Sequence, residues 1–308
     1  MIKKTLLITF AGLLIAFTAC KNTGQKSGDD KMYVVATTTM VHDLVKNIGG
    51  DRIKSDGLMG SGVDPHLYRA SESDVGKLSN ADIIFFNGLH LEGKLVDVFG
   101  KMKRLDKNIY PVADTVKEDK LIPSADYASS YDPHIWFNIN LWKKAAHYIA
   151  GKLAKHDPEN REHYQSNLKN YISEMDSVHK EIKSLIDRVP EDKRILITAH
   201  DAFNYFGQAF GFEVIGLQGI STASEAGVKD VQNLADLIVK NKIGAIFIES
   251  SVPRRNIEAL QEAVKSRGFE VKIGGELYSD ALGTPGTEEG TYTGMFMHNV
   301  KTIVEALK

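Results

Sequence analysis

A long stretch without glycine, residues 157–189, constrains the fold of this chain more than any other feature of its sequence. Pro158 stands at the N1 position after Asp157 as the expected cap, and Pro190 ends the stretch. At about 1.5 Å per residue the predicted helix reaches roughly 45 Å, enough to cross a whole domain. We therefore expect a strut that joins two lobes. Its apolar residues recur at spacings that place them on one stripe of a helix: Tyr164, Leu168, Tyr171, Ile172, Met175, Val178, Ile182, Leu185, Ile186 and Val189.

Short β-branched or aromatic runs stand on both sides of this stretch. Each is followed by a polar loop and a segment with helical period, which is typical of a parallel sheet covered by helices. Four runs are predicted as buried strands, at 33–37, 82–86, 194–199 and 244–249. The expected fold class is α/β, with two similar lobes, each a mostly parallel sheet flanked by helices, joined by one long rigid helix.

A weak internal repeat in the sequence supports two lobes of similar structure. Residues 33–50 share a strand–turn–helix–glycine layout with residues 194–211, and residues 81–92 pair in the same way with 244–255. Chance likeness between two βα units is the alternative. The expected division is a lipoprotein signal peptide at 1–19, a lipidated polar tether at 20–32, an N-terminal lobe at 33–155, a linking helix at 156–190 and a C-terminal lobe at 191–308.

The first residues of the chain indicate export. Lys3 and Lys4 precede an apolar run at 5–17, which is too short to span a bilayer of about 30 Å and is typical of a signal peptide. The only cysteine, Cys20, ends the sequence FTAC, which resembles a bacterial lipoprotein cleavage box with phenylalanine in the usual place of leucine. Lipid on Cys20 would anchor the chain to a bacterial membrane on its extracytoplasmic side. A buried cysteine is the alternative.

Composition excludes several classes of protein. The chain has 308 residues, 43% hydrophobic and 25% charged, a balance unlike that of disordered or coiled-coil proteins. Its formal net charge of -2 leaves no basic excess to neutralise phosphates, so we expect no nucleic-acid partner. A single cysteine excludes a disulfide framework and a thiolate metal cluster.

Three of the ten histidines have settings that indicate metal binding. His66 and His134 each end an Asp-Pro-His sequence and precede an apolar and an aromatic residue. Proline fixes φ, and the aspartate can accept the second imidazole N–H, which aims the other nitrogen as metal ligation requires. His200 directly follows a predicted strand, at the edge where open α/β sheets bind ligands. The other seven fit helix surfaces, helical patterns or a loop.

For an oxygen donor we favour Asp280. Gly274 and Gly275 are expected to let the chain turn sharply after a strand and return this carboxylate to the crevice. Glu249 ends a predicted strand near the same crevice, where a hydrogen bond to a ligand and packing between lobes both stay open.

Two further segments have structural interpretations. In the sequence STASEAG, residues 221–227, the side chains of Ser221, Thr222 and Glu225 are predicted to cap the N-terminus of a helix. Trp136 and Phe137 are expected to form the wall of the crevice.

Together these motifs resemble the metal-binding lipoproteins of ABC importers, the cluster A-I solute-binding family, and most closely its TroA-like members. The resemblance covers nearly the whole mature chain. It implies two α/β lobes with a metal in the cleft between them, a monomer, no catalytic residues, and delivery to an ABC permease with a cytoplasmic ATPase. It implies ligands at His66, His134, His200 and Asp280, the same four positions. The motifs that carry it are DPHLY, DPHIWFN, TAHDAFNYF, GLQGISTASEAG, IFIESS and IGGELYSDALG.

The donor set bears on the choice of metal. Three imidazoles and one carboxylate suit tetrahedral Zn²⁺, and the manganese-specialised relatives carry glutamate where this chain has His200. The zinc-dedicated relatives have a long histidine-rich loop, whereas residues 117–131 contain no histidine. The sequence therefore favours Zn²⁺ and keeps Mn²⁺ and Fe²⁺ open.

We expect high-affinity capture of such a metal outside the cytoplasm, and not an enzyme. One alternative is a surface adhesin with a structural metal. The other is a zinc hydrolase in which His66, His134 and His200 hold the metal and Asp280 acts as base. The chain has no His-Glu-x-x-His sequence, and its lipoprotein signal suits capture better than turnover.

Overall fold

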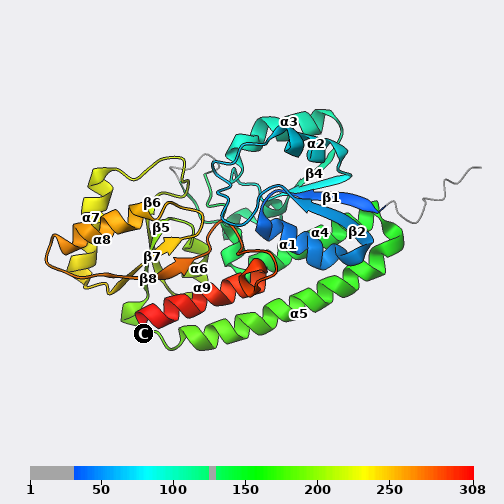
Figure 1. Cartoon of the computed structure of the whole chain (residues 1–308). Helices are drawn as coiled ribbons and strands as arrows, with labels where there is room; N and C mark the ends of the chain where they lie inside the picture. Colours follow the sequence, from blue (N-terminus) through cyan, green and yellow to red (C-terminus); the bar gives the residue numbers. More distant parts are fainter. Residues whose placement is uncertain (1–30, 125–129) are drawn as a thin grey trace, which may run out of the picture. The chain divides into compact units, whose positions relative to one another are not determined.

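Parallel β-sheets carry the fold of this protein, whose computed structural model describes residues 31–124 and 130–308 (Figure 1). Residues Met32–Lys308 form one compact unit. The predicted signal peptide at 1–19 and Cys20 lie outside the described residues. Below, the residues before the long helix α5 are called the N-terminal half, and those after it the C-terminal half.

The sheet of the N-terminal half is parallel throughout, with strand order β2-β1-β3-β4. Alternate residues of its inner strands face opposite sides: Val34 packs toward α1 and α4, whereas Val35 packs with α2 and α3. Both faces are therefore covered by helices. The elements are β1 Met32–Ala36, α1 Thr39–Gly49, β2 Ile53–Gly57, α2 Glu72–Asn80, β3 Ile83–Phe86, α3 Val96–Arg104, β4 Asn108–Pro111 and α4 Ile139–His156.

The C-terminal half repeats this layering. Strand β5 pairs in parallel with β6, β7 pairs in parallel with β8, and β5 lies beside β7 (Figure 1). Ile197 and Ile246 pack with α7 and α8, whereas Leu196 and Phe247 join the cluster that contains α6 and α9. The elements are β5 Ile195–His200, α6 Asn204–Phe210, β6 Glu213–Gln218, α7 Val228–Asn241, β7 Ala245–Glu249, α8 Arg255–Lys265, β8 Lys272–Leu277 and α9 Tyr292–Leu307.

The α/β class with parallel sheets flanked by helices is confirmed. The four predicted strands form as β1, β3, β5 and β7, each within one residue of its predicted bounds. The strands beside them, β2, β4, β6 and β8, were not predicted. They are mostly half-buried and lack the continuous apolar run of a strand that is covered on both faces.

The long helix α5 spans Arg161–Ile186 and follows a 3-10 turn at Pro158–Asn160. The predicted stripe is buried except at Ile172, Val178 and Leu185, which are partly buried, and it packs against α1 and α4 of the N-terminal half and α9 of the C-terminal half. Asp157 is the N-cap residue of the 3-10 turn with Pro158 at N1, as predicted, but its side chain caps no backbone N–H. Its carboxylate accepts hydrogen bonds from the Asn160 amide at 2.8 Å and the Tyr164 hydroxyl at 2.6 Å. Within the described part of the chain, no helix is both long and apolar enough to cross a membrane.

A buried carboxylate lies where α1 meets α5. Asp43 accepts a hydrogen bond from the hydroxyl of Tyr171, and both side chains are buried. Burial raises the pKa of Asp43 to about 6, against the opposing effect of the tyrosine hydrogen bond. Because the unfolded carboxyl titrates near pH 4, the native protein holds this proton over a range where the unfolded chain releases it.

We predict that Asp43→Asn removes a pH-dependent part of the free energy of unfolding. The contribution of Asp43 is fully present below about pH 4 and is lost as the pH rises through about 6, a change of about 3 kcal/mol. In urea titrations the variant should therefore gain stability relative to wild type between pH 4 and pH 7. The exposed Asp187→Asn variant is the control, and a difference that does not change with pH for Asp43→Asn contradicts the prediction.

Candidate metal centre

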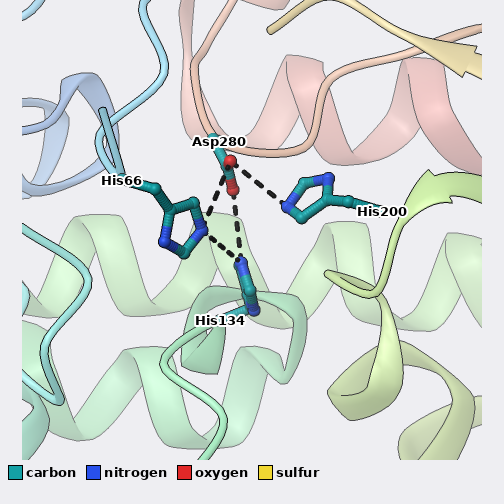
Figure 2. A group of neighbouring side chains, drawn as sticks. All are labelled: His66, His134, His200 and Asp280. Atoms are coloured by element: carbon teal, nitrogen blue, oxygen red, sulfur yellow. Dashed lines mark hydrogen bonds and ion pairs between the residues drawn. The ribbon is translucent and has the colours of Figure 1, made fainter. Parts of the chain in front are cut away.

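The four side chains predicted as metal ligands lie together (Figure 2). One ligand atom of each of His66, His134, His200 and Asp280 lies within 4.8 Å of all the others. Each lies at or after the carboxyl end of a parallel strand. His66 lies between β2 and α2, and His134 lies between β4 and α4. His200 is the last residue of β5, and Asp280 follows β8, so each half of the chain supplies two of the four.

The carboxylate of Asp280 lies among the three imidazoles. Its Oδ1 is 3.4 Å from Nε2 of His134, and its Oδ2 is 3.3 Å from Nε2 of His200 and 3.8 Å from Nε2 of His66. The Nε2 atoms of His66 and His134 are 3.4 Å apart. Ligands held about 2.0–2.1 Å from a tetrahedral ion lie about 3.3–3.4 Å from one another. The spacing is therefore close to that of a four-coordinate zinc site.

All four side chains are buried, with exposed fractions between 0% and 4%. Nε2 of His200 and both carboxylate oxygens of Asp280 have no hydrogen-bond partner in the part of the chain that the structure describes. Buried polar atoms without a partner are costly, and native proteins rarely leave them so. A divalent ion at the centre would bind Nε2 of His200 and a carboxylate oxygen of Asp280 at once, so the donor set fits a transition metal.

The electrostatic surroundings prepare the site for a cation. Burial lowers the pKa of His66 to about 3, which leaves that imidazole neutral. Burial would raise the pKa of Asp280, but the imidazoles of His200 and His134 hold it well below its usual range. Burial would lower the pKa of His134, yet the Asp132 carboxylate raises it to about 9. A metal must therefore displace a proton from His134 on binding.

Two carboxylates orient two of the imidazoles. The Asp132 carboxylate accepts a hydrogen bond from Nδ1 of His134 at 2.7 Å and another from the backbone N–H of His134 at 2.8 Å. The Glu249 carboxylate likewise accepts hydrogen bonds from Nδ1 of His200 at 2.5 Å and from the backbone N–H of His200 at 2.8 Å. These bonds turn Nε2 of each ring toward the centre. Of the two roles left open for Glu249, the structure therefore has the hydrogen bond to a candidate ligand.

The two Asp-Pro-His sequences are only partly alike in structure. Asp64 accepts the backbone N–H of His66 at 2.8 Å, as Asp132 does for His134. Its other oxygen accepts the hydroxyl of Thr222 at 2.6 Å, which joins the two halves near the site. The predicted hydrogen bond between the aspartate and the imidazole is therefore present at His134. The two oxygens of Asp64 instead accept hydrogen bonds from the backbone N–H of His66 and the hydroxyl of Thr222.

The capping role predicted for Ser221, Thr222 and Glu225 is wrong, because the N-cap residue of α7 is Gly227. Helix α7 begins at Val228, and the backbone N–H of Gly227 donates to Asp230 at 2.8 Å. The hydroxyl of Ser221 accepts a hydrogen bond from the backbone N–H of Ala223 at 3.2 Å, which forms a local turn. Extended backbone at the glycine lets Asp230 take the capping role that the hydroxyls were expected to fill.

The two glycines before Asp280 lie inside β8 and not after it, contrary to the predicted turn. Gly275 has a φ of 146° where the register between β7 and β8 shifts. A Cβ on Gly274 would lie 2.8 Å from the Phe247 ring and 2.7 Å from Ala306. The glycines therefore allow a bulge and the close approach of α9 to the strand.

Two residues of α6 that support the site were not predicted from the sequence. Asn204 donates from its amide to the Asp132 carboxylate at 3.1 Å, and the Tyr205 hydroxyl donates to the Asp132 carbonyl at 3.0 Å. Both belong to the TAHDAFNYF motif, but their target lies more than seventy residues earlier, and no spacing rule connects them. Trp136 and Phe137 were both expected to form the wall of the crevice. Trp136 does contact the His134 ring, whereas Phe137 packs against Phe203 in the core.

Known proteins that resemble this chain are consistent with the geometry. The family described as zinc-uptake complex component A, periplasmic (ZnuA), matches residues 34–306. The chain is 46% identical to the manganese-binding lipoprotein MntA of Bacillus subtilis, over 95% of each chain. It is 45% identical to the zinc-binding protein TroA of Treponema pallidum, over 96% of this chain and 95% of that protein.

A third relative is named for another metal. The iron ABC transporter substrate-binding lipoprotein MtsA of Streptococcus pyogenes is 33% identical, over 99% of each chain. The solved structure of the periplasmic zinc-binding protein TroA from Treponema pallidum has a TM-score of 0.87 to this chain, at 46% identity. The matched region covers 90% of this chain and 99% of the TroA chain. The names of these relatives therefore specify zinc, manganese and iron.

We predict that Glu249→Gln weakens Zn²⁺ binding about 10–100-fold, because loss of the carboxylate leaves Nδ1 of His200 without a charged acceptor. Competition with a chromogenic chelator measures the affinity. Glu276→Gln changes an exposed carboxylate on the neighbouring strand β8 and serves as the matched control. Equal affinities for the two variants would show that Glu249 does not support the site.

Proposed function

The chain belongs to the zinc-uptake component A (ZnuA) family, and we propose that it captures a divalent transition metal outside the cytoplasm and delivers it to an ABC importer. One observation carries the proposal: three histidines and an aspartate from both halves converge on a buried point where three ligand atoms lack hydrogen-bond partners. Proteins of this family are solute-binding components and not enzymes. Asp280 lies within 3.3–3.8 Å of all three Nε2 atoms, in the fourth position that a hydrolase keeps for water.

The proposed cargo is Zn²⁺, with Mn²⁺ and Fe²⁺ as the other candidates. Three imidazoles and one carboxylate favour zinc over the harder manganese, and zinc binds nitrogen donors more tightly by the Irving–Williams order. The spacing of the four ligand atoms supports the same choice. Chemical preference for zinc does not by itself determine which metal the protein carries in the cell, where availability also decides.

We propose that the halves act as lobes, at 33–155 and 191–308, held by the linking helix at 156–190. Each lobe supplies two ligands, so a bound metal stabilises one relative orientation. Helix α5 packs against α1 and α4 on one side and α9 on the other, which supports a strut that resists wide opening. Metal exchange is then expected to need small tilts and loop rearrangement.

The proposed location is the extracytoplasmic side of a bacterial membrane, through lipid on Cys20. Removal of residues 1–19 would expose this cysteine as the first residue, followed by a polar tether. Two of the relatives are named lipoproteins, which supports the proposal. The proposed partners are a permease and its cytoplasmic ATPase, and the protein is proposed to work as a monomer. No feature of the described residues favours the adhesin alternative.

Elemental analysis tests the function. A soluble form that starts after Cys20 is stripped with chelator and offered equimolar Zn²⁺, Mn²⁺ and Fe²⁺. We expect one zinc per chain, lost in His66→Ala and Asp280→Ala, and an affinity at least about 100-fold lower in His200→Ala, because only three ligands remain. The exposed His147→Ala variant should bind as wild type does. Absence of stoichiometric metal from wild type would overturn the proposed function.

The strut predicts little change in dimensions on metal binding. Small-angle X-ray scattering of the stripped and loaded protein should give nearly equal radii of gyration, because α5 packs continuously against both halves. A large decrease on loading would mean that the halves close by a wide hinge motion, and the strut would have to be abandoned.

A further inference from the structure

Trp136 connects the segments that carry two candidate ligands from different halves of the chain. It lies two residues after His134, and its ring centroid is 5.2 Å from that of His134, in an edge arrangement. Its indole Nε1 donates a buried hydrogen bond to the carbonyl oxygen of Ser279 at 3.0 Å. Ser279 directly precedes Asp280. One side chain therefore contacts a ligand of the N-terminal half and holds the backbone beside a ligand of the C-terminal half.

The backbone of Trp136 is itself held in place. The hydroxyl of Tyr292, at the start of α9, donates to the Trp136 carbonyl oxygen at 2.7 Å. Both side chains are almost fully buried, so water does not compete for these bonds. Trp136 therefore has a defined position from which its indole can set the position of Ser279.

A second hydrogen bond between the halves is made by the backbone that follows Asp280 in the sequence. The backbone N–H of Leu282 donates to the hydroxyl of Thr39 at 2.8 Å, at the start of α1. The Asp280 segment is thus held to the N-terminal half both before and after the carboxylate. His134 and Asp280 are far apart in sequence, so the separation of their ligand atoms depends on such contacts between the halves.

We propose that Trp136 is a positioning residue for the metal, whose indole N–H bond to Ser279 sets the separation of His134 and Asp280 and thereby favours Zn²⁺ over Mn²⁺. The inference rests on the proposed function. With this bond, Nε2 of His134 and Oδ1 of Asp280 lie 3.4 Å apart, close to the edge of a zinc tetrahedron. Without it, the two ligands are held less firmly at this separation, and the site loses its fit to a small four-coordinate ion more than to a larger ion that prefers six ligands.

The test compares two substitutions of the same kind. Trp136→Phe removes the indole N–H and keeps an aromatic ring beside His134. Trp142→Phe is the matched control, because Trp142 is also fully buried but its Nε1 has no hydrogen-bond partner among the described residues. We expect Trp136→Phe to weaken Zn²⁺ binding about 10–100-fold and Mn²⁺ binding by much less, so that the ratio of the two affinities falls. Trp142→Phe should leave the ratio unchanged.

The ratio separates positioning from general destabilisation, because both metals bind the same folded protein. Tyr292→Phe provides a second route if Trp136→Phe does not fold: it removes the hydroxyl that holds the Trp136 carbonyl and should lower the ratio in the same direction. The chain has two tryptophans, so Trp142→Phe also leaves Trp136 as the only indole. Its fluorescence should then change on Zn²⁺ binding.

The outcomes distinguish the inference from the function on which it rests. Equal Zn²⁺/Mn²⁺ ratios in Trp136→Phe, Tyr292→Phe and Trp142→Phe, with wild type binding one metal, would overturn the positioning role and leave metal capture intact. Wild type that binds neither metal would overturn both. A lower ratio confined to the Trp136 and Tyr292 variants supports the positioning role.

Discussion

The buried carboxylate of Asp280 requires partners from both halves of the chain. An ionised carboxylate without hydrogen-bond donors is costly in a protein interior. Here its two oxygens lie 3.3–3.8 Å from the Nε2 atoms of three imidazoles, two of which come from the other half of the chain. The two halves must therefore meet at this point for the carboxylate to be satisfied, and a divalent ion would satisfy it best. Metal affinity and the relative position of the halves are consequently linked.

The contacts around the site preserve this arrangement. Asp132 and Glu249 orient two imidazoles, and Asn204 and Tyr205 of the C-terminal half reach Asp132 in the N-terminal half. A continuous apolar cluster extends from α1 and α4 through α5 to α6 and α9. The polar bonds place the ligands, and the apolar cluster keeps the halves from separating. This division of roles suits a protein that must hold a small ion tightly and still release it to a transporter.

Part of the fold was readable from local patterns. Strands β1, β3, β5 and β7 are covered on both faces, so their sequences are continuous apolar runs. The strands beside them have mixed burial and no comparable signal. Helix α5 was predictable from its long uninterrupted stripe, although its first turn and the role of Asp157 were not. The segment 221–227 was misread because a hydroxyl-rich sequence suits a cap in general, whereas here Thr222 reaches Asp64 across the site.

Local periodicity was enough to predict the α/β class and the long helix, and short motifs such as Asp-Pro-His, together with the family resemblance, indicated the four candidate ligands. The partner that orients each ligand could be identified only in the folded chain. Glu249 meets His200 because β5 and β7 lie side by side, and Trp136 meets Ser279 because the halves pack together. Hydrogen bonds between residues distant in sequence leave no periodic signal, so their partners become known only when the chain is folded.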